Sequence, residues 1–97
     1  MTRAAGFNEL IHAPTRLSLV ALLAAAEWAD FGFVRQSLEL SESALSKQVS
    51  TLSEAGYVEI RKDGAGRNRR TRLRLSPTGR AAFRDHVAAL QKIIGPG

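Results

Sequence analysis

The side chains with the clearest chemical purpose are the basic ones between residues 61 and 74. This segment holds six arginines and one lysine against a single acid, Asp63. Such a concentration of positive charge is unfavourable unless a polyanion lies opposite it. The planar guanidinium of arginine pairs with phosphate through two parallel hydrogen bonds, whereas lysine would serve solubility equally well. The composition therefore favours nucleic acid as the partner, and a solvated, solubilising surface is the alternative.

A second group of polar side chains lies in residues 42–55, where Leu45, Val49 and Leu52 are spaced for one buried face of a helix. Serine and threonine lower helix propensity, so a purely structural helix would favour Ala, Glu and Lys. They suit a helix that the major groove of DNA must approach closely. The alternative is that exposed serines have no role. The candidate contact residues are Ser43, Ser46, Lys47, Gln48, Ser50 and Thr51.

The elements before this helix are predicted to be helical too. Residues 7–12 form a helical turn, and Pro14 begins a helix whose apolar stripe runs from Leu17 to Ala24. Residues 29–32 are expected to be a connection, followed by a short helix over residues 33–38. The residues of this short helix that we expect to be buried are Phe33, Val34 and Leu38.

The hydrophobic period changes from 3.6 to 2 after Gly56, which suits the left-handed residue that ends a helix. Val58 and Ile60 alternate with polar neighbours, as in a strand with one buried face. Residues 63–66 form a turn, and the returning strand points Thr71, Leu73 and Leu75 inward. Ser76 and Pro77 then begin a last helix. The pattern predicts a mainly α domain over residues 1–97 with a small β-hairpin.

Residues Leu38 to Val58, with their Leu-Ser-Lys and Ala-Gly-Tyr-Val segments, resemble the helix-turn-helix of bacterial winged-helix regulators related to the MarR and ArsR families. Residues 66–80 are similar to the wing and last helix of those regulators, and residues 12–17 resemble their opening. The resemblance covers nearly the whole chain. It implies a winged helix-turn-helix with a three-helix core, a wing and terminal dimerisation helices. The function it implies is a homodimeric DNA-binding regulator, and most simply a repressor.

Chemistry assigns a role to each candidate contact. Gln48 can pair with an adenine edge through both amide atoms, although many relatives have histidine there, and Lys47 can bind guanine or a phosphate. The hydroxyl residues can bind phosphates or either base type. The candidates in the wing (residues 61–74) for a narrow minor groove or its phosphates are Arg67, Arg69, Arg70 and Arg72. For Arg61, Lys62, Arg72 and Arg74, a contribution to the local potential alone is the alternative.

The terminal helices offer more apolar surface than one small domain needs. We expect them to pack across a two-fold axis in a homodimer, which would space two recognition helices for successive grooves. The alternative is that they complete the core of the monomer. The candidate interface residues are Leu10, Ile11, Val87, Leu90 and Ile94.

Other chemistry is not expected. The chain has no cysteine, and Asp85 and His86, neighbours on one helix, point too far apart to share a metal ion with Glu9 or His12. No cofactor, metal or catalytic set is predicted, and no effector can be named. Three aromatic residues are expected in the core rather than around a ligand: Trp28, Phe31 and Phe33.

Two further function classes stay open. One is a winged-helix module that binds proteins, and the other is a non-specific nucleic-acid binder or RNA-binding protein, which sparse exposed aromatics disfavour. No signal peptide is visible, and the apolar run over residues 17–26 is too short to span a bilayer. We therefore expect a cytoplasmic protein that does not enter a membrane.

Overall fold

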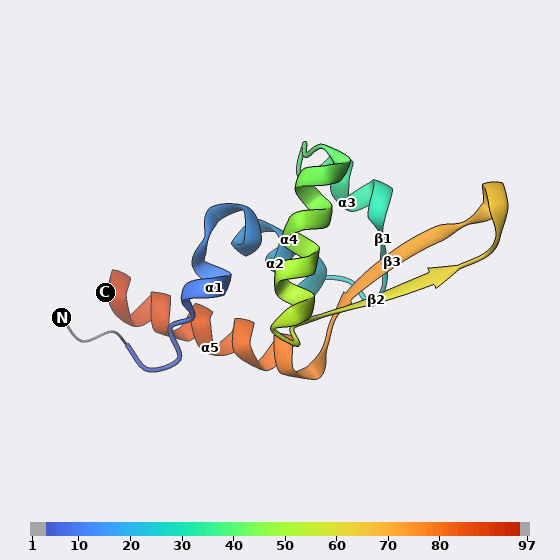
Figure 1. Cartoon of the computed structure of the whole chain (residues 1–97). Coiled ribbons are helices and arrows are strands. Elements are labelled where there is room, and N and C mark those ends of the chain that lie inside the picture. Colours follow the sequence, from blue (N-terminus) through green and yellow to red (C-terminus); the bar gives the residue numbers. More distant parts are fainter. Residues whose placement is uncertain (1–3, 96–97) are drawn as a thin grey trace.

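The computed structural model describes residues 4–95 of the chain. Helices form a body from which a two-stranded ribbon protrudes at one end, while the last helix extends at the other (Figure 1). The principal extents of 51 × 25 × 22 Å reflect this elongation. The elements in chain order are α1 (Glu9–His12), α2 (Pro14–Ala24), β1 (Ala29–Asp30), α3 (Phe31–Ser37), α4 (Glu42–Glu54), β2 (Val58–Asp63), the 3-10 turn η1 (Gly66–Asn68), β3 (Arg70–Leu75) and α5 (Pro77–Ile94). The predicted mainly α fold with a small hairpin is confirmed.

The helix boundaries follow from local chemistry. Pro14 and Pro77 occupy first turns, where an N–H has no partner to lose. The Ser41 hydroxyl accepts a hydrogen bond from the Ala44 amide at the start of α4, and Ser76 caps α5 in the same way. Gly56, at φ +81°, follows the end of α4 as predicted.

The sheet has three antiparallel strands in the order β1-β3-β2. Ala29 lies opposite Leu73 and Asp30 opposite Arg72, so the predicted connection over residues 29–32 is wrong in its first half. The second half is wrong as well, because α3 already begins at Phe31, where the Asp30 carboxylate caps it. A two-residue strand is too short to show a period in the sequence.

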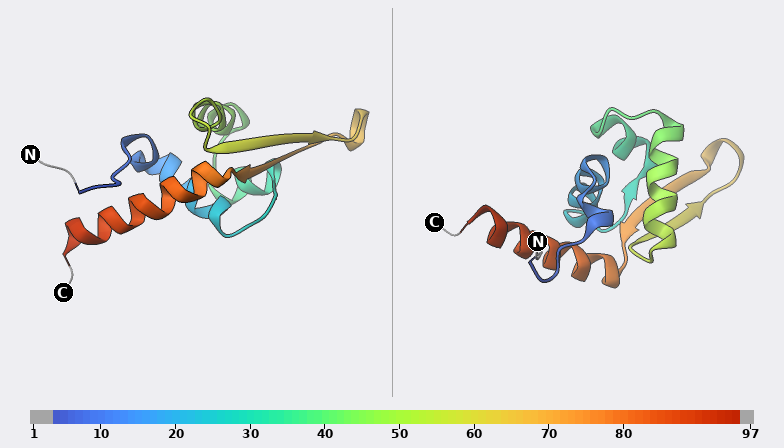
Figure 2. Two further views of the ribbon diagram at one scale, coloured as in Figure 1. Left: turned by 90° about the horizontal axis from the view of Figure 1, so that it is seen from below. Right: turned by 60° about the vertical axis from the view of Figure 1, so that its left-hand side comes forward.

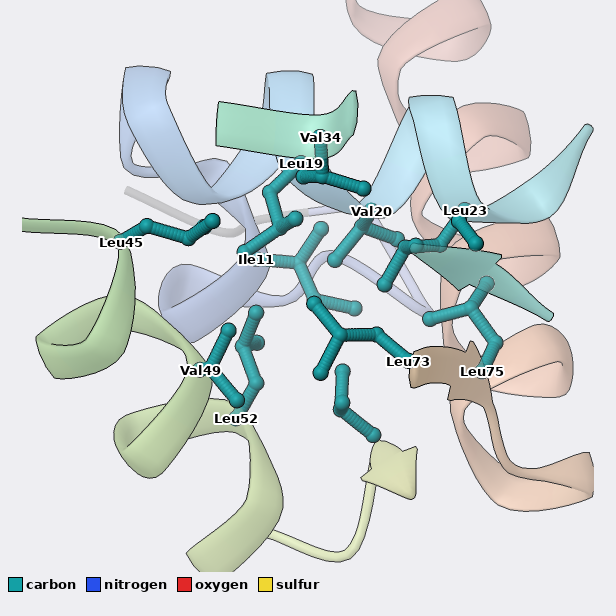
Figure 3. Close-up of a cluster of buried hydrophobic side chains, with 12 residues drawn as sticks. Ile11, Leu19, Val20, Leu23, Val34, Leu45, Val49, Leu52, Leu73 and Leu75 are labelled. Atoms are coloured by element: carbon teal, nitrogen blue, oxygen red, sulfur yellow. The ribbon is translucent and has the colours of Figure 1, made fainter. Parts of the chain in front are cut away.

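The core gathers side chains from α1 to β3 (Figure 3). Ile11 lies inside this cluster and is fully buried, so its assignment to a dimer interface is wrong. The short helix α1 packs against α2 and inserts Ile11 into the body, because four residues bury their one large apolar side chain only in this way. The buried hydrophobic residues are Ile11, Leu19, Val20, Leu23, Ala29, Val34, Leu45, Val49, Leu52, Val58, Leu73, Leu75 and Ala89.

Two side chains predicted to be buried are largely in solvent. Phe33 is 58% exposed because it lies in the first turn of α3, away from the side that carries Val34. Ile60 is 43% exposed because the hairpin leaves the body at this point of β2. Of the three aromatic residues expected in the core, only Phe31 packs against the core cluster, and Trp28 is half-buried outside it.

A buried histidine joins the N-terminal segment to α5. His86 is fully buried, and its Nδ1 accepts a hydrogen bond from the Asn8 amide at 2.9 Å. Its other ring nitrogen, Nε2, therefore carries the proton of the neutral form and lies 3.3 Å from Nδ1 of His12. The Phe7 ring contacts both imidazoles, with centroids 4.9 Å from His12 and 4.8 Å from His86. Within residues 4–95, no group of three or more His, Cys, Asp or Glu side chains could hold a metal ion.

This joint makes stability depend on pH. Burial lowers the pKa of the His86 imidazole below its usual 6.5, and the neighbouring His12 lowers it further. The unfolded chain therefore binds this proton more readily than the folded chain, so we expect the free energy of unfolding to fall as the pH drops below about 6.5. Urea unfolding between about pH 7.5 and about pH 5 measures the effect. His86→Asn keeps an acceptor near the Asn8 amide without titrating, and equal pH slopes for this variant and the wild type would contradict the assignment.

Candidate nucleic-acid interface

One face of α4 presents only small or flexible polar side chains to solvent. Ser43, Ser46, Lys47 and Ser50 are exposed, while the three predicted apolar residues are buried on the opposite side. The exposed four share a shallow surface depression with Ser41 and Glu42. Because no bulky side chain rises from this face, a flat or grooved surface can approach the helix backbone closely.

The hydroxyl groups on this face differ in their freedom to bind. Thr51 is half-buried, and its hydroxyl donates to the Lys47 carbonyl at 3.1 Å, so that hydroxyl can only accept from a ligand. The Ser43 hydroxyl lies 3.4 Å from that of Ser41. Within the described part of the chain, Ser46 and Ser50 form no side-chain hydrogen bond and keep both donor and acceptor capacity.

Gln48 is held by the body of the protein. It is half-buried, and its Oε1 accepts a hydrogen bond of 3.0 Å from Nη1 of Arg16 on α2. Arginine only donates, so the amide atom facing it is the oxygen. The same Arg16 donates from Nε to the Leu10 carbonyl at 2.7 Å. In this conformation Gln48 cannot offer both amide atoms to an adenine edge, and no periodic pattern in the sequence signals Arg16.

The hairpin forms the wing, whose tip we define as residues 64–70 and whose base as residues 58–63 and 71–75. The tip turns tightly at Gly64, which has φ +78° and where a Cβ would lie 2.2 Å from the Asn68 carbonyl oxygen. Arg67, Arg69 and Arg70 are exposed there, at the far end of the ribbon (Figure 2). Within residues 4–95 none of these three arginines forms an ion pair.

The arginines of the wing base have partners within the protein. Arg61 pairs with Asp63 at 2.9 Å and Arg74 with Glu59 at 2.5 Å. The predicted contact residue Arg72 is half-buried and lies 4.0 Å from the Asp63 carboxylate. The structure thus divides the basic side chains of the wing into a free group at the tip and a partnered group at the base, with Lys62 exposed between them.

The wing and α4 have a fixed relation. β2 begins soon after α4 ends and contacts it. Both elements lie toward the end of the molecule opposite the C-terminal end of α5 (Figure 1). The hydroxyl face of α4 and the arginine tip are therefore held together on one rigid unit.

The last turns of α5 leave the body and present apolar surface. Ile93 is 56% and Ile94 80% exposed, while Val87 and Leu90 are half-buried. Leu10 packs partly against the core cluster. Among residues 4–95, no helix combines the length and hydropathy that a membrane crossing requires.

Known proteins share this sequence and fold. A curated relative, the uncharacterized protein MJ0432 of Methanocaldococcus jannaschii, is 27% identical over 81 residues, which cover 84% of each chain. A solved transcriptional regulator homologue from Pyrococcus horikoshii OT3 shares 23% identity and has a TM-score of 0.84, over 90% of this chain and 86% of that one.

A second solved structure, a possible transcriptional regulator for arsenical resistance, is 33% identical with a TM-score of 0.67, over 84% of this chain and 80% of that one. A family model described as a winged helix DNA-binding domain matches residues 15–94. The resemblance inferred from the sequence is therefore confirmed, and the chain belongs to the family of winged helix DNA-binding domains.

Proposed function

We propose that this protein is a homodimeric transcriptional regulator that reads duplex DNA with α4 and represses by occupying its target. The observation that carries the proposal is the fixed pairing of an exposed hydroxyl-rich helix face with three arginines that have no ion-pair partner within the described chain. Relatives of the same fold that are described as transcriptional regulators support the transfer of this role.

In the proposed complex, α4 enters the major groove. Ser46 and Ser50 have free hydroxyls for base edges or phosphates, and Lys47 can bind guanine or a phosphate. The helix carries Lys47 against Glu42 and Glu54, so it supplies little electrostatic attraction of its own. We therefore assign it shape complementarity and sequence discrimination.

The wing tip supplies the attraction in this proposal. Three exposed arginines at the end of a ribbon fit a narrow minor groove, whose negative potential attracts guanidinium groups, or the phosphates beside it. Because these side chains have no carboxylate partner among residues 4–95, binding to DNA breaks no ion pair.

Dimerisation is proposed through the C-terminal part of α5. Two neighbouring isoleucines more than half exposed are costly in water, and a second copy packed on them would remove that cost. The wing lies at the other end of the long axis, so a dimer formed here leaves both wings free (Figure 2).

Selection of bound duplexes from a random pool tests the proposed function. We expect a palindrome whose half-sites lie about one helical turn apart, because a two-fold dimer presents two equivalent helices. Recovery of bound duplexes without a motif would indicate a non-specific binder. Failure to retain any duplex would contradict DNA binding and favour the protein-binding alternative.

Replacing Arg67 and Arg69 together by alanine should weaken binding to all duplexes roughly tenfold or more, and should lower the salt slope by about one for each lost phosphate contact. Fluorescence anisotropy over a series of salt concentrations measures both quantities. Arg84→Ala, which removes an exposed arginine from α5, is the control and should leave the slope unchanged. An unchanged slope in the wing variant would remove the wing from the DNA contact.

Ile94→Glu should shift the protein toward monomer, because a charge in an apolar interface loses its hydration without a partner. Sedimentation equilibrium measures the shift. Phe33→Glu is the matched control, since Phe33 is also a large, largely exposed apolar residue but lies on α3. A dimer that is unaffected by Ile94→Glu, or a wild-type monomer at the concentrations that support DNA binding, would contradict this interface.

A further inference from the structure

The outer face of the sheet, which points away from the core, carries one aromatic side chain. Trp28 is the only tryptophan of the chain and immediately precedes β1. Since Ala29 lies opposite Leu73 and faces the core, the alternation of the strand places Trp28 beside Arg74 on the outer face. The guanidinium carbon of Arg74 lies 4.4 Å from the indole centroid, and that of Arg61 lies 4.8 Å from it.

Carboxylates orient both guanidinium groups for this contact. Arg74 donates from Nε to Glu59, which lies directly opposite it on β2, and Arg61 donates from Nε to Asp63 on its own strand. Each arginine therefore uses an edge for a carboxylate and stacks near the indole, an arrangement for which the planar guanidinium is suited. Trp28 thereby contacts both strands of the wing, since Arg61 belongs to β2 and Arg74 to β3.

The wing needs support on this face because the core supports little of its length. On the inner face Leu73 and Val58 are buried, but Ile60 is already 43% exposed and Lys62 is in solvent. β1 pairs with β3 over only two residues. A two-stranded ribbon is marginally stable by itself, so the direction of the wing depends on what holds its base.

We propose that Trp28 is a positioning residue for DNA binding, which fixes the wing base by stacking with Arg61 and Arg74 and so sets the direction in which the tip arginines approach a duplex. Trp28 itself contacts no DNA. The inference rests on the proposed function for its consequence, while the hold on the wing can be measured in the free protein.

Two substitutions separate stacking from bulk. Trp28→Leu keeps an apolar side chain but removes the aromatic face, and Trp28→Phe keeps an aromatic face. In the free protein we expect NMR order parameters of the tip amides, residues 64–70, to fall in the leucine variant and to stay near the wild-type values in the phenylalanine variant. The δ protons of Arg61 and Arg74 should lose their ring-current shifts only in the leucine variant.

On the selected duplex, affinity should fall roughly tenfold in Trp28→Leu and recover in Trp28→Phe. A double-mutant cycle shows whether this loss acts through the wing tip. In the background in which Arg67 and Arg69 are alanine, Trp28→Leu should cost little further affinity. A residue that merely stabilises the fold would weaken binding equally in both backgrounds.

The outcomes are separable from those of the proposed function. If the wild type binds duplex DNA but the leucine and phenylalanine variants agree in tip order and affinity, the positioning role is wrong and the proposed function stands. If the wild type binds no duplex, the proposed function fails and the DNA-binding role of Trp28 fails with it. Should Trp28→Leu not fold, Arg61→Met with Arg74→Met removes the stacked cations instead, and an unchanged tip order would overturn the inference.

Discussion

The alternation of side chains along β3 is the constraint on which the rest of the structure depends. Leu73 and Leu75 are buried against the helices, while Arg72 and Arg74 lie on the opposite face of the same strand. β3 is also the central strand, bonded to both β1 and β2. A slip of one residue would turn the arginines into the core and the leucines into solvent. The burial that stabilises the domain therefore also fixes which side of the wing is basic.

The long periodic elements could be predicted from the sequence, because several turns of a helix or a full strand repeat the same signal. Thus α2, α4, α5 and the hairpin were predicted, together with the caps Ser41 and Ser76. Elements of two to four residues repeat nothing. β1 was missed for this reason, and α1 was predicted as a turn whose Ile11 was assigned to the wrong surface. Packing against the body, which local sequence does not contain, decides both cases.

The candidate interface was predicted to the same depth. Which residues of α4 face solvent follows from its helical period, and the exposure of the tip arginines follows from the turn. The contact of Gln48 with Arg16 and the stacking of Arg61 and Arg74 on Trp28 join residues that are 32 to 46 positions apart, and nothing in their local sequence indicates a partner. His86 is a similar case, because a polar residue on α5 is buried by contacts with the N-terminal segment.

The partners of the basic residues change what the wing charge means. The window from residue 61 to residue 74 excludes Glu59, which pairs with Arg74, and Asp63 is within reach of two further arginines. Carboxylates therefore compensate much of the charge at the wing base, and at close range the tip presents the uncompensated part. At long range a polyanion still experiences the whole excess, because screening and distance blur the individual pairs. In the proposed complex, the whole wing would steer the encounter with DNA, whereas only its tip would determine the contacts that persist.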